Sequence, residues 1–293
     1  MKKIILPTAI LFTLVFCCTI ISVAQNAASD TATVTDSTKE KEKISIYAGA
    51  AYSSRLHYYG RTDSLKSSAF LPTVIIQAGK HFSVTPTFIF IKNSNTNFEY
   101  AATIINATYS FGKKKGVAGT ITADKFFYKD QSKLVQAVQQ GQAGFTLSYL
   151  NKFVNINTGA SAAFTKDDID YFANAGIDHQ FKFVKKQNIF LIKPAVVANA
   201  GTQNFTRTYY KNNGFPLLPP SQQMVTETSK KFNLLSYDIK MDVIYAIKRF
   251  IVSVTPGYVL PQNVITVPNN PSLSENAKNL FFCNAVVVYR LTK

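Results

Sequence analysis

The sequence has no tryptophan, only three cysteines, and half as many acidic as basic residues, 16 against 32. Cys17 and Cys18 belong to an apolar N-terminal stretch, so the remainder of the chain holds one cysteine, Cys283. An internal disulfide is therefore excluded, although small secreted domains often depend on disulfides. No run of about 18 apolar residues follows this stretch, which excludes a membrane-spanning helix from the rest of the chain.

The N-terminal stretch has the three parts of a secretory signal peptide. Two lysines precede an almost wholly apolar run, and Ser22–Ala24 offers the small residues that signal peptidase requires. We expect residues 1–24 to be a cleaved signal peptide. A lipoprotein-type cut before Cys17 is the alternative, but Phe16 is bulky for that site.

The formal charge of +16 suggests nucleic-acid binding in a cytoplasmic protein. Two features oppose that interpretation here, namely the export signal and the absence of a continuous basic stripe. We predict no nucleic-acid partner.

Beyond the leader the chain falls into two parts. Residues 25–43 are small, polar and charged without periodicity, which predicts a disordered periplasmic tail. From Ile44 onward, apolar and polar residues alternate with the period of two that is typical of half-buried strands. Twelve such segments are predicted, at 44–54, 69–79, 82–92, 98–111, 117–128, 142–150, 153–164, 170–184, 189–205, 232–246, 250–260 and 280–291. Short and long connections alternate between them, as in an up-and-down antiparallel array.

Prolines occur inside three of the predicted strands. Pro86 and Pro256 follow Val-Thr in two similar stretches, and Pro194 follows Phe190. Because proline offers no N–H to a neighbouring strand, each is predicted to mark a bulge or a bend.

The two faces of the segment at 235–245 differ in polarity. One face carries Leu235, Tyr237, Ile239, Met241, Val243 and Tyr245. The other carries Ser236, Asp238, Lys240 and Asp242. Ten or eleven tilted residues cross an apolar band of about 25 Å, and aromatic residues at both ends of the apolar faces are typical of membrane interfaces. The apolar face is predicted to contact lipid, and the polar face to line a lumen.

These patterns predict an all-β fold, a membrane-spanning up-and-down antiparallel β-barrel of about 12 strands over residues 44–293. In lipid every backbone polar group needs a partner, so the first strand is expected to pair with the last. A soluble periplasmic β-barrel that binds a ligand, with its apolar face inward, is the alternative.

The leader, the tail, the twelve amphipathic segments and the Val-Thr-Pro strand openings resemble outer-membrane β-barrel proteins of the Bacteroidota type. The resemblance covers about residues 44–293 and rests on pattern rather than on a diagnostic motif. It implies the outer membrane of a Gram-negative cell, with lipopolysaccharide and phospholipid as surrounding partners.

Polar residues of the predicted lumen are the candidates for function. They are Asp124, Asn174, Asp178, Lys182, Lys193, Asn199, Asp238, Lys240 and Asp242. Such residues either form a network that plugs a narrow barrel or line a polar conduit. A narrow, porin-like channel for small solutes is the predicted function, and a closed barrel that acts as a structural or interaction module is the alternative.

The predicted turns and loops differ in chemistry. The short turns contain no acidic residue, and their basic residues are Lys80, Lys113, Lys114, Lys115, Lys152, Lys185, Lys186, Lys248 and Arg249. If that rim faces the periplasm, these cations lie beside lipid phosphates. The long loop at 206–231 is apolar and rich in proline, and Phe215, Leu217 and Leu218 are predicted to contact a protein partner or to cover the mouth.

Signals for catalysis and metal binding are weak. His57, His81 and His179 lack a serine at the spacing of outer-membrane phospholipases, and the acidic stretch at 166–170 lacks a full series of Ca²⁺ ligands. Phosphate-binding and dinucleotide-binding fingerprints are missing as well. We predict no enzymatic activity, no cofactor and no metal site.

Overall fold

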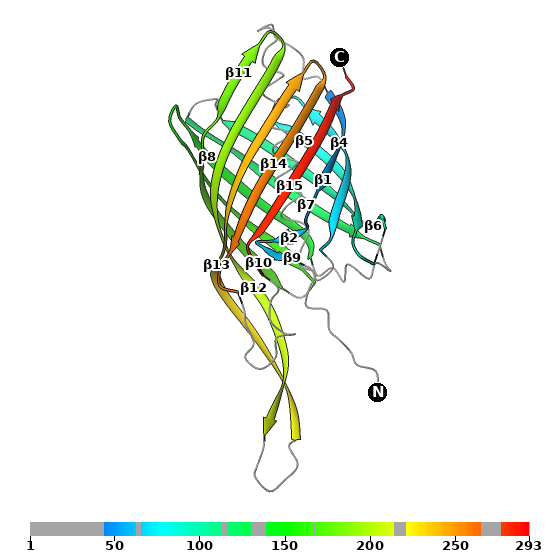
Figure 1. Cartoon of the computed structure of the whole chain (residues 1–293), viewed down its shortest axis with the longest axis vertical. Helices are drawn as coiled ribbons and strands as arrows, with labels where there is room; N and C mark the ends of the chain where they lie inside the picture. The colour runs from blue at the N-terminus through cyan, green and yellow to red at the C-terminus, as the bar shows by residue number, and fades with distance from the viewer. Residues whose placement is uncertain are drawn as a thin grey trace.

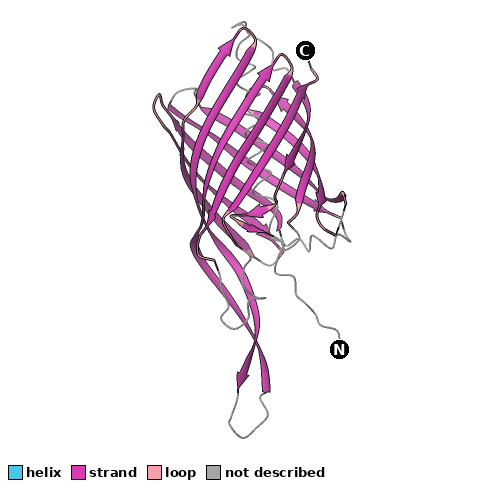
Figure 2. Cartoon of the chain, in the orientation of Figure 1, coloured by secondary structure: helices cyan, strands magenta, loops and turns pink. Residues whose placement is uncertain are grey.

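The structure is a computed structural model that describes most of the chain from Ile44 onward. It describes residues 44–62, 66–95, 97–112, 116–129, 139–166, 168–213, 221–264 and 277–292, and of 203–213 and 221–230 the backbone alone. Over these ranges every regular element is a β-strand (Figure 2). None of the described residues forms a helix long and apolar enough to cross a membrane.

Thirteen strands form the large sheet, and two short strands form a hairpin. The large sheet contains β1 (Ile44–Ser53), β4 (Ser68–Ala78), β5 (Phe82–Lys92), β6 (Glu99–Gly112), β7 (Gly116–Tyr128), β8 (Gln139–Leu150), β9 (Asn155–Thr165), β10 (Ile169–Asp178), β11 (Phe181–Lys185), β12 (Asn188–Asn213), β13 (Ser221–Ile247), β14 (Phe250–Pro261) and β15 (Leu280–Arg290). The hairpin consists of β2 (His57–Tyr58) and β3 (Arg61–Thr62).

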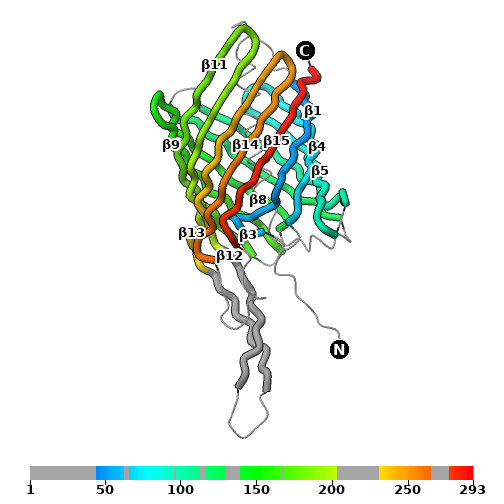
Figure 3. The backbone as a smooth tube through the Cα atoms, viewed as in Figure 1, coloured from blue at the N-terminus to red at the C-terminus, as the bar shows by residue number. Residues whose placement is uncertain are grey.

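The large sheet closes into a barrel (Figure 1). Strand β1 pairs with both β4 and β15, which puts the first and last strands side by side (Figure 3). Strands β10 and β11 follow one another along the same edge of β12, so thirteen strands fill twelve positions in the ring. All of the pairings are antiparallel. The predicted twelve-strand barrel is confirmed.

Two of the differences between the predicted and the observed strand boundaries have a clear local cause. Strand β9 begins at Asn155 rather than at position 153, because the Asn151 side-chain oxygen accepts the backbone N–H groups of Phe153 (2.8 Å) and Val154 (3.0 Å) in a turn. The segment predicted at 170–184 is divided into β10 and β11, and the interruption lies opposite Pro194.

Of the bulge or bend predicted at each proline, the bulge is wrong, since Pro86, Pro194 and Pro256 pair in register. The register shifts lie between Ile89 and Phe90, between Gln139 and Gly141, and between Asn199 and Ala200. At Pro86, β5 keeps its register with β6, so a missing N–H there does not require an extra residue.

The prediction of a loop is also wrong for residues 206–213 and 221–231, where β12 and β13 continue to pair. Their register runs from Asn188↔Ile247 to Asn213↔Ser221. This two-stranded ribbon extends past the barrel at the end opposite the chain's C-terminus (Figure 1). Phe215, Leu217 and Leu218 lie outside the described residues.

The outer wall of the barrel is apolar. Large side chains that are 37–53% exposed on this wall include Ile105, Ile121, Phe145, Leu147, Ile177, Val196, Ile239 and Val287. Soluble proteins rarely expose a contiguous apolar surface of this extent, whereas a membrane barrel requires one. The apolar face therefore points outward, as predicted for lipid contact, and the barrel spans a membrane.

One residue assigned to that face turns inward. The register shift places Asn199 opposite Ser236 and Ala200 opposite Leu234, so Leu235 is an extra residue in β13. A bulge of this kind re-aims the side chain it contains. Leu235 is 2% exposed and belongs to an inner apolar cluster, instead of lying on the lipid face as predicted.

The lumen wall is not polar throughout. Strand β15 directs Asn284 inward, but Val286 and Val288 share that face and are buried. Near the short turns, β13 and β14 likewise direct Ile244 and Ile251 inward. Polar lumen residues therefore occupy only part of each strand.

Adjacent residues on β8 allow a test of the two faces. Leu147 lies on the outer wall and Thr146 on the lumen side. We expect Leu147→Arg to lower the free energy of unfolding in bilayers by about 2–4 kcal/mol, because the guanidinium would enter lipid. Thr146→Arg is the control, and denaturant titration in lipid vesicles measures both variants. Equal losses at the two positions would contradict the assigned faces.

Candidate functional site in the barrel lumen

Strands β6 to β13 contribute a belt of polar side chains to the lumen. Residues directly opposite one another in antiparallel strands share a face. The register places Asn106 opposite Asp124 and Asn155 opposite Asp178. Asp124 and Asp178 thus have neutral amides as cross-strand neighbours, whereas Asp242 lies opposite the cation Lys193.

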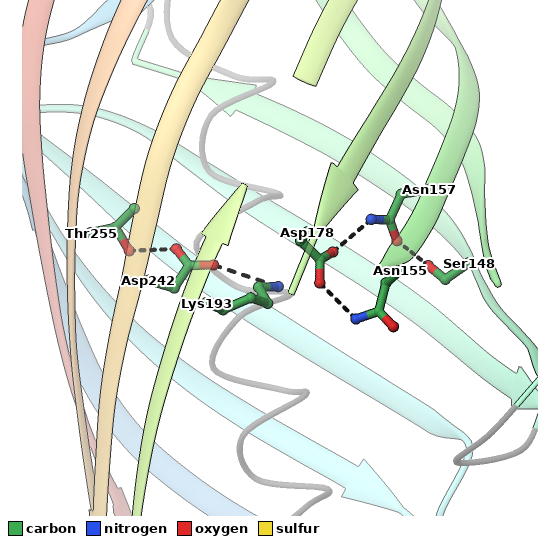
Figure 4. A network of polar contacts seen from close by, with 7 residues as sticks. All are labelled: Ser148, Asn155, Asn157, Asp178, Lys193, Asp242 and Thr255. Carbon is green, nitrogen blue, oxygen red and sulfur yellow. Dashed lines mark hydrogen bonds and ion pairs between the residues drawn. The ribbon is translucent and has the colours of Figure 1, made fainter. Parts of the chain in front are cut away.

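The Asp178 carboxylate is held by two amides (Figure 4). Asn155 Nδ2 donates to Oδ1 at 2.8 Å, and Asn157 Nδ2 donates to Oδ2 at 2.6 Å. The Ser148 hydroxyl donates to Asn157 Oδ1 at 2.6 Å and fixes that amide. The chain of contacts therefore runs across β8, β9 and β10.

The Asp242 carboxylate lies nearby, between strands β12 and β14 (Figure 4). Lys193 Nζ is 3.5 Å from Oδ2, and the Thr255 hydroxyl donates to Oδ1 at 2.8 Å. The Asp242 side chain is 1% exposed, whereas that of Lys193 is 28% exposed. The pair therefore presents its cation, and not its anion, to the lumen.

Two further carboxylates are bound along the wall by neutral donors. Asp238 accepts from the Ser236 hydroxyl at 2.7 Å and from Asn199 Nδ2 at 3.0 Å. Asp124 accepts from Asn106 Nδ2 at 2.7 Å. Charge-assisted hydrogen bonds of this kind hold a carboxylate against the wall.

The remaining candidates lie apart from these bonds. The Asn174 side chain lies over Gly159, where an added Cβ would be 3.1 Å from its amide atoms. Lys182, on β11, is exposed opposite Leu191. Lys240 lies opposite Ala195 and Gly257, and takes part in neither the Lys129–Glu99 nor the Lys193–Asp242 pair.

Sequence reasoning missed the inward hairpin β2–β3, which follows β1. Its Tyr58 ring lies 6.0 Å from the Phe172 ring of β10, and the His57 ring lies 4.8 Å from the Phe282 ring of β15. In the ring order β1 is six positions from β9 in either direction, and β10 is next to β9. The hairpin therefore reaches across the lumen to the far wall.

Arg61 fixes this hairpin to the mouth of the barrel. Its guanidinium donates to the backbone carbonyls of Leu235 (3.3 Å) and Gln262 (3.2 Å), and Arg61 is 4% exposed. Gly60 has a φ of 80°, and a Cβ there would lie 3.0 Å from Pro261 Cβ. The tip thus needs glycine both for its backbone angle and for its close approach. The run of Leu56, Tyr58 and Tyr59 in a largely polar loop was the sequence signal that could have revealed this hairpin.

Burial alters two titratable groups of the hairpin. Burial lowers the pKa of His57 from its usual 6.5 to about 4. Burial, and secondly the charge of Asp238, raises the pKa of the Tyr59 hydroxyl. Both side chains are therefore neutral in the folded protein at pH 7.

Within the described ranges no three His, Cys, Asp or Glu side chains come together as metal ligands. His179 faces the outer wall, where its ring lies 4.5 Å from that of Phe181. A phenyl ring can act neither as a base nor as a nucleophile. The contact with Phe181 therefore gives His179 no catalytic partner.

No protein-family model matches the sequence, and no curated protein matches it significantly. Two solved structures with a similar course of chain are an outer membrane channel from Pseudomonas putida F1 and OmpF from Salmonella typhi in complex with daunomycin. The first has 10% identity, a TM-score of 0.46 and coverage of 88% of this chain and 100% of that one. The second has 10% identity, a TM-score of 0.31 and the same coverage. Likeness at this level carries no information on the solute.

The Lys193–Asp242 pair can be tested by a double-mutant cycle. We expect Lys193→Met to lower the free energy of unfolding by about 1–3 kcal/mol, because Asp242 would keep only the Thr255 hydroxyl. Combining it with Asp242→Asn should recover part of that loss, and Lys240→Met serves as the control without an ion pair. Losses that add within about 0.5 kcal/mol would contradict the coupling.

Docking of the hairpin should depend on pH through His57. The pKa of His57 is about 4 when the hairpin is docked, against the usual 6.5. Between these two pH values the undocked hairpin therefore binds more protons than the docked one. Docking is therefore expected to weaken as the pH falls from about 6.5 to about 4, and to change little above that window.

The absence of tryptophan makes Tyr59→Trp a unique fluorescent reporter of this docking. Its emission should shift to the red over that window, and the shift should vanish when His57→Phe is added. The same shift in both variants would contradict the role of His57.

Proposed function

We propose that the protein is a narrow outer-membrane channel for small solutes. The observation that supports this best is the polar belt of the lumen, enclosed by a wall whose outer face is apolar. The free-energy cost of placing Asn, Ser, Thr and paired ions along a water-filled conduit is far lower than the cost of placing them in lipid. The Bacteroidota-type resemblance, with its implied Gram-negative outer membrane, belongs to the same proposal.

The channel is narrow because of the β2–β3 hairpin. A twelve-strand barrel encloses more space than its wall side chains fill. Tyr58 and Tyr59 bring two rings into that space, and Arg61 holds them there through backbone carbonyls of β13 and of the residue after β14. The solute must pass beside the hairpin, so small size is the first requirement.

Lipopolysaccharide and phospholipid are the proposed surroundings of the outer wall. The exposed basic residues Lys80, Lys152, Lys185, Lys186, Lys248 and Arg249 lie in the described short turns. Aromatic side chains near them, such as Phe82 and Phe250, are 44% and 49% exposed. Rings at the interface with cations just beyond are the arrangement that suits lipid headgroups.

The experiment is single-channel recording in planar bilayers. We expect discrete conductance steps from the purified chain, and larger steps when residues 56–62 are replaced by a glycine-serine linker of equal length. The same replacement of 93–98, on the same rim, is the control and should leave the steps unchanged. Heat-modifiable gel mobility verifies folding of each variant. No steps from any folded variant would refute the channel.

A closed barrel that acts as an interaction module is the second candidate. The ribbon of β12 and β13 favours it, since the two strands continue past the barrel as a paired backbone with two open edges. Such edges accept a further strand from a protein partner. Cross-linking from positions 206–231 in intact cells tests this, and a failure to recover a specific protein from any of these positions would exclude the candidate.

A further inference from the structure

We propose that the channel prefers small anions, such as carboxylates and inorganic phosphate, over cations. This rests on the proposed channel function and names the solute class for the same lumen. Three groups of charges carry it, one at each entrance and one inside.

The entrance formed by the short turns is basic. Its described turns contain Lys80, Lys152, Lys185, Lys186, Lys248 and Arg249, all exposed, and no acidic residue. A rim of one charge sign raises the local concentration of ions of the opposite sign. Anions are therefore enriched at this entrance.

The opposite entrance is also basic over its described residues. The basic side chains near that rim are Arg55, Lys66, Lys92, Lys129, Lys166, Lys231 and Lys278. The acidic ones are Glu99, Asp168 and Asp170. Lys129 Nζ lies 3.7 Å from Glu99, and Asp170 is 3% exposed, so this rim too presents more positive than negative charge.

Inside the lumen, the four carboxylates are bound by donors of the wall. Asp124 and Asp242 are 6% and 1% exposed and are hydrogen-bonded to neighbouring side chains of the wall. Asp178 and Asp238 each accept two hydrogen bonds from neutral side chains. Two of the four carboxylates are thus buried, and the negative charge of the other two is partly satisfied by neutral donors of the wall.

The lysines of the lumen reach away from the wall. Lys193 is 28% exposed although its partner Asp242 is buried, and Lys182 is exposed. Lys240 is partly exposed; its charge acts on the nearby Asp238 carboxylate, but within the described part of the chain it forms no salt bridge. Their long side chains carry the ammonium groups further inward than the shorter aspartates carry their carboxylates. A passing ion therefore meets ammonium groups first, which is the arrangement of anion-conducting pores.

The test is the reversal potential of the purified, full-length mature protein in planar bilayers under a KCl gradient. We expect its sign to show that chloride is more permeant than potassium. Lys240→Gln should lower the chloride-to-potassium permeability ratio by about two- to fivefold, as one charge near the path implies. Lys182→Glu combined with Lys240→Glu should reverse the preference.

Lys125→Gln is the matched control, since Lys125 is exposed on the outer wall opposite Ile105. It removes the same charge without touching the lumen and should leave the ratio unchanged. Conductance that favours potassium, or a ratio that Lys125→Gln lowers as much as Lys240→Gln, would overturn the anion preference alone. Absence of conductance would instead overturn the channel itself.

Discussion

The structure depends on one constraint, which is that a strand in apolar surroundings cannot leave its backbone polar groups unpaired. Twelve positions of antiparallel strands meet this constraint only when the ring closes. Closure occurs at β1 and β15, where pairing runs from Tyr47↔Arg290 to Ser53↔Asn284. Beyond the last strand, Leu291 N–H donates to Ile46 O at 2.8 Å, and Ile46 N–H donates to the Thr292 hydroxyl at 3.1 Å. The seam is therefore sealed up to the rim.

Closure also sets the chemistry of the two faces. Because side chains alternate along a strand, one register assigns every residue either to lipid or to the lumen. The polar belt follows from this alternation, since Asp124, Asp178 and Asp242 each meet a donor that the neighbouring strand supplies. The hairpin β2–β3 then uses the enclosed space, with Arg61 joining it to backbone carbonyls near the mouth.

Much of this architecture could be predicted from the sequence, because long alternating segments report directly on a two-faced strand. The bulge at Leu235 could not, since one extra residue reverses the parity without changing the composition. The hairpin was missed because its strands have two residues each, and because His57 contacts Phe282, which is far away in the sequence. A loop was predicted in place of the long ribbon, because the sequence of the ribbon lacks the alternation of apolar and polar residues that is typical of strands in contact with lipid. Polar candidates were easier to identify than their hydrogen-bond partners, which depend on register.

All of these features require lipid outside the barrel and water inside it. The most direct measurement places single spin labels at positions 239 and 287 of the outer wall and at 146 and 240 of the lumen, with the protein in lipid vesicles. We predict that labels at 239 and 287 collide mainly with oxygen, which concentrates in lipid, and that labels at 146 and 240 collide mainly with a water-soluble nickel complex. The reverse pattern, with an aqueous outer wall and a dry interior, would contradict the account.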